Sequence, residues 1–179
     1  VFKPTGFGRF AIFEKIGAGK SLTSTETEEW ERIKNRFDVA CKKAHDLDVA
    51  LLIDGEESWM QDAADDLVAD MMRKYNKQKS IVFNTLQMYR WDRMDYLKEL
   101  HQQSKGEGFK IGMKVVRGAY MEKENDRAEE KGYPSPICAS KKATDENFNA
   151  AVNYMIDNLE DISLFAGTHN EDSCYQLME

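Results

Sequence analysis

A chain of 179 residues with 41% hydrophobic content and three tryptophans is long enough for one domain with a sizeable core. Its net charge of −7 and sequence pI of about 5.1 argue against a dedicated nucleic-acid binder, so we expect no nucleic-acid partner. No apolar run approaches a membrane span, and no secretory signal is visible. The three scattered cysteines indicate reduced thiols in a cytosolic or matrix-like compartment, not a disulfide framework or a zinc site.

The first half of the chain alternates short apolar segments with longer amphipathic ones. The apolar segments predict strands at 1–3, 49–53 and 80–83. The amphipathic segments predict helices at 9–16, 25–46, 57–75 and 91–103. Thr25 and Glu28 have the spacing of a capping box at the start of the second of these helices.

The second half continues the same alternation. It predicts strands at 110–116, with the sequence KIGMKVV, and at 162–166, with the sequence ISLFA. Helices are expected at 121–131, from Thr144 onward, and after the last strand through Glu179. The helix that begins at Thr144 has an apolar face made of Phe148, Ala151, Val152, Met155 and Leu159.

Alternating strands and helices are typical of βαβ units, which form a parallel sheet with right-handed crossovers. Polar residues follow all the predicted strands. They are Lys3, Asp54, Glu56, Asn84, Gln87, Lys114, Arg117, His169 and Asn170. A (β/α)8 barrel gathers all such positions on one face, whereas a doubly wound sheet binds ligands at its switch point. The sequence therefore predicts an α/β fold of the TIM-barrel type.

A complete barrel of this type has eight strands and about 250 residues. The sequence supplies about five strands and then only part of a further helix. We therefore expect either a truncated barrel with the first five βα units or a barrel that closes with another chain. Open sheet edges would favour self-association.

The segment 113–120, MKVVRGAY, combines features that suit a ligand site at a strand end. Lys114 and Arg117 bracket the end of the predicted strand, and Tyr120 follows. Gly118 permits a tight bend or a close ligand approach. Cations, a glycine and an aromatic side chain suit a flat, electron-rich, anionic ligand such as a flavin. The alternative is a strand-to-helix turn with solvated charges, which the recurrence of polar residues at other strand ends disfavours.

The remaining candidates each have a structural alternative. Asp54 suits an acid or base, or a partner for a cation, whereas Glu56 and Glu57 are typical of a helix N-terminus. The amides of Asn84 and Gln87 suit a heteroaromatic ring, or ordinary turn hydrogen bonds. A single histidine such as His169 is often structural. Because no second histidine or cysteine lies at metal-ligand spacing, we expect no metal.

Four blocks of sequence, LLIDGEE, IVFNTLQMYR, MKVVRGAYMEKE and AGTHNED, occur in this order and resemble the proline dehydrogenase family. The segment VFKPTGFGRF resembles the eukaryotic-type first strand, so the resemblance covers essentially the whole chain. It implies a distorted (β/α)8 barrel with FAD across the strand ends. It also implies oxidation of L-proline to Δ1-pyrroline-5-carboxylate, the first step of proline catabolism, with electrons passed to membrane quinone.

The resemblance also implies roles for individual residues. Lys3 corresponds to a lysine near the substrate carboxylate, Asp54 to the partner of a substrate-binding arginine, and Tyr120 to an aromatic that lines the active site. These three are the expected catalytic residues. The expected cofactor contacts are Asn84, Gln87, Lys114, Val116, Arg117, Gly118, Ala119, Thr168, His169 and Asn170.

The resemblance places residues 1–179 in the N-terminal part of the catalytic barrel domain, without its C-terminal strands and final helix. The paired arginines that clamp the substrate carboxylate in the family would then lie outside this chain. We therefore expect the chain alone to be inactive. For the full-length protein we expect a cytoplasmic location or peripheral association with an inner membrane, on the matrix side of the mitochondrion if the source is eukaryotic.

Three other functions fit the same residues. The first is another flavin-dependent barrel oxidoreductase, of the methylenetetrahydrofolate reductase type. The second is a flavin-free barrel enzyme that uses Asp54 and the cations on a phosphorylated or carboxylated substrate. The third is a non-catalytic half-barrel that binds a partner through its open sheet edges.

Overall fold

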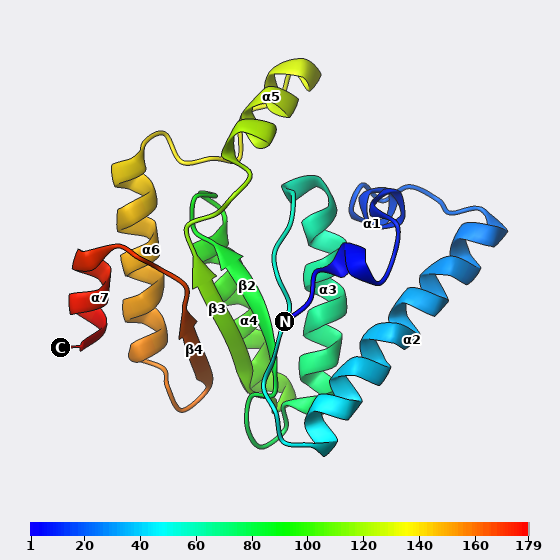
Figure 1. The fold of residues 1–179 in the computed structure, drawn as a ribbon, viewed down its shortest axis with the longest axis horizontal. Coiled ribbons are helices and arrows are strands. Elements are labelled where there is room, and N and C mark those ends of the chain that lie inside the picture. Colours follow the sequence, from blue (N-terminus) through cyan, green and yellow to red (C-terminus); the bar gives the residue numbers. More distant parts are fainter. Residues whose placement is uncertain (179) are drawn as a thin grey trace.

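The computed structural model describes residues 1–178 as an α/β structure around one parallel sheet (Figure 1). Within these residues the sheet has four strands in the order β1-β2-β3-β4. The strands are β1 (Leu51–Leu52), β2 (Val82–Gln87), β3 (Ile111–Val116) and β4 (Ile162–Ala166). The helices are η1 (Pro4–Gly6), α1 (Phe10–Gly17), α2 (Ser24–Asp46), α3 (Ser58–Tyr75), α4 (Arg93–Glu107), α5 (Met121–Lys131), α6 (Lys141–Ile156) and α7 (Glu171–Met178).

The strand order follows the chain order, as it does in a barrel. All neighbouring strands are parallel. Because right-handed crossovers between sequential strands fall on one side of a sheet, α3, α4 and α6 all cover the same face. A doubly wound sheet would reverse its order at a switch point. The predicted parallel α/β architecture is therefore confirmed, and the other face of the sheet is left free of crossover helices.

Three strand predictions need correction. The expected strand at 1–3 is reduced to one parallel bridge between Phe2 and Ile53. The strand predicted at 49–53 keeps only Leu51–Leu52 as a ladder. The strand predicted to end at residue 83 instead runs on to Gln87, since Asn84 and Thr85 are buried and find hydrogen-bond partners inside the protein.

The helix boundaries differ by a few residues from those predicted. Helix α2 begins one residue earlier than expected, and its capping box is formed by Thr23 and Glu26, two residues before the predicted pair. Helix α4 continues to Glu107 and ends at Gly108, whose φ of 70° closes it in the left-handed conformation. Leu159 was predicted on a buried helix face, but it follows the end of α6 and is exposed.

Two further observations concern the helices. The helix expected to reach Glu179 is seen as Glu171–Met178, and Glu179 lies outside the described residues. Among the helices of residues 1–178, none is both long and apolar enough to cross a membrane.

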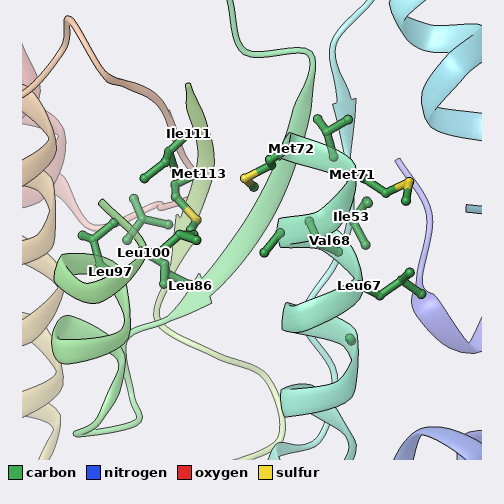
Figure 2. Packing of buried hydrophobic residues seen from close by; sticks show 14 of the residues in the cluster. Ile53, Leu67, Val68, Met71, Met72, Leu86, Leu97, Leu100, Ile111 and Met113 are labelled. Carbon is green, nitrogen blue, oxygen red and sulfur yellow. The ribbon is translucent and has the colours of Figure 1, made fainter. Parts of the chain in front are cut away.

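The core fills the space between the sheet and its covering helices. Figure 2 shows side chains of α4 packed against outward-facing residues of β2 and β3. These residues are Leu97, Leu100, Leu86, Ile111 and Met113. Successive side chains of a strand point to opposite faces. Residues of the other parity, such as Thr85, Gln87, Lys114 and Val116, therefore point to the face without helices.

A buried asparagine sets where β2 and β3 start. Asn76 follows the last residue of α3 and is fully buried. Its side-chain oxygen accepts hydrogen bonds from the amides of Ile81 and Val82, both at 2.9 Å. Its side-chain nitrogen donates to the carbonyls of Val82 at 2.8 Å and Lys110 at 3.0 Å. One amide group thus joins a helix end to two strands.

Replacing this amide should be costly. We expect Asn76→Ala to lower the free energy of unfolding by about 3 kcal/mol or more, because each buried polar group left unpaired costs roughly 1–3 kcal/mol. Urea unfolding followed by circular dichroism measures the change. Asn35→Ala, at an exposed site on α2, is the control and should change stability by less than about 0.5 kcal/mol. Equal effects of the two substitutions would contradict the assigned role.

Candidate functional site

A cavity of about 470 Å³ opens at the carboxyl ends of the strands. Its lining comes from the N-terminal segment, the loops after β1, β3 and β4, and the inner faces of β2 and β3. The inner face is the one that α3, α4 and α6 do not cover. The lining residues are Lys3, Asp54, Gly55, Thr85, Gln87, Lys114, Val116, Arg117, Gly118, Ala119, Tyr120, Lys141, Gly167, Thr168, His169 and Asn170. The structure thus brings together every residue that the sequence singled out as catalytic or cofactor-binding, with the exception of Asn84.

A carboxylate shared by two lysines lines this cavity. Lys114, on β3, donates a hydrogen bond to one oxygen of Asp54, and the ammonium of Lys3 lies 3.8 Å from the other. Lys3 also donates to the hydroxyl of Tyr120 at 3.2 Å, although 117 positions separate the two residues in the chain. Side chains from the N-terminal segment, the loop after β1, the end of β3 and the start of α5 therefore form one connected group.

The surroundings of Lys3 favour its charged form. Burial alone would lower the pKa of Lys3, but the hydrogen bond to Tyr120 and the charge of Asp54 raise it above its ordinary value. The side chain remains half exposed. Lys3 is therefore a protonated donor at the rim of the cavity.

The inner face of β2 contributes a threonine and a glutamine. The hydroxyl of Thr85 donates to the carbonyl of Ile53 at 2.7 Å, so it links β2 to the residue that follows β1. The side chain of Gln87 is buried against Gly55, where a Cβ atom would come within 3.0 Å of the amide oxygen. Because Gly55 has no side chain, the Gln87 amide lies close to the backbone of the loop after β1.

Asn84 lies on the other face of β2. Its side-chain nitrogen donates to Asp65 of α3 at 2.9 Å and to the hydroxyl of Tyr96 of α4 at 3.2 Å. Its side-chain oxygen accepts from the amide of Thr85 at 2.8 Å. The expectation that Asn84 presents its amide at the cavity is therefore not met, because β2 continues through this position and alternation directs Asn84 toward the helices. Gln87 is the amide that reaches the cavity.

Gly118 is placed against an aromatic ring. Its φ is 137°, which L side chains rarely adopt, and a Cβ atom here would lie 2.5 Å from the ring of Tyr89. The amide of Tyr89 donates to the carbonyl of Arg117 at 2.6 Å. The predicted tight bend is thus present, and the backbone that leads to Tyr120 rests directly on this ring.

The Arg117 guanidinium joins three segments at the rim of the cavity. It donates to Asp145 of α6 at 2.6 Å, to the hydroxyl of Thr168 at 2.9 Å and to Ser173 of α7 at 3.0 Å. Its carbon lies 4.4 Å from the centre of the Phe148 ring. Although Arg117 lines the cavity, its hydrogen bonds are directed at the protein, and they hold the loop after β4 in place.

The loop after β4 has its own internal support. The hydroxyl of Thr168 accepts from the amide of Asn170 at 3.0 Å, and the side-chain oxygen of Asn170 accepts from the amide of Ser173 at 2.9 Å. His169 lies between these two residues and is exposed. The polar groups of Thr168 and Asn170 therefore serve the loop, while His169 and the backbone remain open to the cavity.

The charge of the lining fits an anionic ligand. Four cationic side chains line the cavity, namely Lys3, Lys114, Arg117 and Lys141, and Asp54 is the one carboxylate among the described lining residues. At Gly118 and Gly167 an added Cβ atom would clash with Tyr89 and Val116, so the backbone at these two positions packs directly against neighbouring side chains. Within residues 1–178, no group of three or more His, Cys, Asp or Glu side chains is placed to hold a metal ion.

A second cavity of about 1100 Å³ adjoins the first. The two share the loop 117–120 and Lys141. The second also takes in Lys123, Ser140 and the buried ring of Tyr89. An elongated ligand in the first cavity therefore has room to extend past Tyr120 along hydroxyl and lysine side chains.

Comparison with known proteins identifies the family. The family model for proline dehydrogenase matches residues 10–179. The chain belongs to the proline dehydrogenase family. Proline dehydrogenase 1 of human mitochondria is 36% identical over 89% of this chain and 28% of the relative. Carbapenem antibiotics biosynthesis protein CarD of Pectobacterium carotovorum subsp. carotovorum is 36% identical over 99% of this chain and 46% of the relative. The chain thus spans less than half the length of these curated relatives.

A solved structure with the same arrangement of elements supports the fold. Proline utilization A (PutA) from Corynebacterium freiburgense superposes with a TM-score of 0.79 over 98% of this chain and 18% of that chain, at 21% sequence identity. This likeness concerns the fold alone. Together with the sequential parallel strands, it confirms the predicted TIM-barrel type for the described part of the chain.

Four of the residues that line the cavity of this chain were not identified from the sequence. They are Gly55, Thr85, Lys141 and Gly167. Thr85 has the same strand parity as Gln87, so a correct end for β2 would have identified it. No sequence pattern identifies Lys141 as a lining residue. It is the first residue of α6, and the path of the loop that leads to this helix cannot be read from the sequence.

The three hydrogen bonds of the Arg117 guanidinium can be tested by substitution. We expect Arg117→Lys to lower the free energy of unfolding by about 1–2 kcal/mol, because one ammonium cannot reproduce three directed guanidinium bonds. Amide hydrogen exchange at residues 167–173 should become faster. Lys141→Met is the matched control, since Lys141 contacts the same carboxylate of Asp145 but is 77% exposed. Unchanged exchange in Arg117→Lys would contradict the assigned role.

Proposed function

We propose that the intact protein is an FAD-dependent proline dehydrogenase that oxidises L-proline to Δ1-pyrroline-5-carboxylate. The observation that supports this most strongly is the connected group of Lys3, Asp54, Lys114 and Tyr120 at the strand ends, in a chain that belongs to this family. Residues 1–179 would then form the N-terminal part of the catalytic barrel domain.

The first cavity suits the flavin ring, and the second suits the rest of the dinucleotide. Bound FAD would supply the hydride acceptor for the oxidation. Lys114, fixed by Asp54, places a positive charge beside the inner face of β3, where it would stabilise negative charge that develops on a neighbouring ring. The Gln87 amide offers hydrogen bonds from the floor of the same cavity.

The substrate would lie between the ring and the rim of the cavity. Lys3 would attract the carboxylate of L-proline, and Tyr120, which Lys3 contacts, would border the substrate. A lysine is a flexible point charge, so Lys3 alone fixes the orientation of a carboxylate poorly. The proposal therefore includes further cations from the part of the protein beyond this chain.

The amine of L-proline must also lose a proton. Among the described residues that line the cavity, the one carboxylate is Asp54, and it is already shared by Lys3 and Lys114. Each of its two oxygens therefore already faces a lysine ammonium. The proposal therefore assigns the proton to solvent at the open rim.

The proposal extends to the electron acceptor and to location. We infer that membrane quinone accepts the electrons and that the full-length protein associates with the membrane peripherally. Relatives from human, fly and other eukaryotes are named as mitochondrial proteins, which supports the matrix side of the inner membrane for a eukaryotic source.

The flavin can be tested first. The intact protein should release FAD on heating, and it should reduce an artificial electron-accepting dye when L-proline is added. Residues 1–179 alone should hold little FAD and show no turnover, because within the described part β4 has no strand beyond it to close the cavity. An intact protein that is colourless and cannot be reconstituted with FAD would exclude this function.

The role of Asp54 can be separated from cofactor binding. In the intact protein, Asp54→Ala should reduce kcat/KM for L-proline by about 100-fold or more, because both lysines lose the carboxylate that places them. FAD content should fall much less. Asp126→Ala, at an exposed site on α5, is the control and should leave both quantities unchanged. Parallel loss of FAD and turnover in Asp54→Ala would instead assign Asp54 to cofactor binding or folding.

A further inference from the structure

Glu56 lies just before the start of α3, where an acidic side chain is usually exposed to solvent, but here it is buried. It is 5% exposed, and the residue that caps α3 is its neighbour Glu57. Both carboxylate oxygens of Glu56 are used by one residue of the N-terminal segment. The amide of Thr5 donates to one at 2.9 Å, and the hydroxyl of Thr5 donates to the other at 2.7 Å. Glu56 therefore connects the loop after β1 to a segment 51 positions earlier.

The partner, Thr5, lies in the turn that follows Lys3. The turn η1 begins directly after Lys3, and the amide of Gly6 donates to the carbonyl of Lys3 at 2.9 Å. Before Lys3, the chain is attached to the sheet through the bridge between Phe2 and Ile53. The backbone of Lys3 therefore lies between Phe2, which bridges to the sheet and packs on Phe7 and Phe37, and a turn whose Thr5 is bound by the carboxylate of Glu56.

We propose that Glu56 is a positioning residue that holds Lys3 at the substrate end of the cavity through Thr5. Glu56 does not line the cavity within the described structure, and its two hydrogen bonds to Thr5 connect it to the turn that follows Lys3. The inference rests on the proposed function of Lys3 as the cation for the substrate carboxylate. It gives a role at the site to a residue that the sequence assigns to a helix N-terminus and that does not line the cavity.

The physical reason lies in the flexibility of lysine. The Lys3 side chain is half exposed, and among residues 1–178 its ammonium contacts Asp54 and Tyr120 alone. A long side chain with such limited support depends on its backbone for position. Small misplacements of a binding group reduce activity strongly, so freeing the turn should weaken substrate binding while the cofactor side of the cavity is left intact.

The first experiment measures steady-state kinetics of the intact protein with L-proline. Glu56→Leu removes both acceptor oxygens at similar volume, and KM should rise about tenfold while kcat changes less than twofold and FAD content is unchanged. Glu56→Gln should restore most of the affinity, because its amide can accept from the Thr5 amide and donate to the Thr5 hydroxyl. Thr5→Val removes one of the two bonds and should raise KM by a smaller factor.

The second experiment asks whether the effect passes through Lys3. In a Lys3→Met background, Glu56→Leu should cause no further rise in KM. The control is Glu29→Leu, because Glu29 also accepts hydrogen bonds from the N-terminal segment, at 2.8 Å from Arg9, but is remote from Lys3 in the chain. It should leave KM unchanged. A KM unaffected by Glu56→Leu, or raised equally with and without Lys3, overturns the proposal.

A third measurement is independent of activity. Amide hydrogen exchange in residues 2–7 should become faster in Glu56→Leu and remain unchanged in Glu29→Leu. Unchanged exchange in Glu56→Leu shows that Glu56 does not hold the turn, and it overturns the proposal even if KM rises. An unmodified protein that does not oxidise L-proline refutes the proposed function instead, while exchange still reports whether Glu56 fixes the segment.

Discussion

The arrangement of the cavity depends on the contacts of the Asp54 carboxylate with two lysines. The loop that carries Asp54 also connects distant parts of the chain. Asp54 joins Lys3 to Lys114, and Glu56 in the same loop joins the N-terminal turn. Ser58, at the start of α3, donates from its amide at 2.7 Å and its hydroxyl at 2.6 Å to Glu124 of α5, which is fully buried. Three acidic side chains thus fix the segments that border the cavity.

This arrangement separates the stability of the fold from the geometry of the site. Apolar packing between the sheet and α3, α4 and α6 holds the strands, as Figure 2 shows for Leu97, Leu100 and Met113. The N-terminal turn and α5 are instead directed by buried hydrogen-bonded carboxylates. Removing one partner of such a group leaves an unpaired charge or polar atom, which is expensive in a protein interior. Substitutions at these carboxylates should therefore disturb the site more selectively than substitutions in the core.

Much of the fold followed from periodicity, and the errors have physical causes. Strands and helices alternate as predicted, since apolar spacing reports the buried face directly. Asn84 was misplaced because a polar residue inside β2 was taken as the end of the strand, whereas a buried network with Asp65 and Tyr96 satisfies it. Glu56 was assigned to an ordinary helix start because its partner, Thr5, is distant in the chain. Periodicity carries no information about such long-range polar contacts.

The charge of the cavity is opposite to that of the chain. The chain as a whole carries a net charge of −7, yet four cationic side chains line the cavity within the described residues, against the single carboxylate of Asp54. Such a contrast concentrates the positive potential at one place on an acidic surface, and clefts of one sign attract ligands of the other. A flavin dinucleotide and an amino-acid carboxylate would both be drawn to the same edge of the sheet. Asp54 contacts both Lys3 and Lys114 at that edge. Its negative charge reduces the positive potential there, and its contacts determine where the two ammonium groups lie.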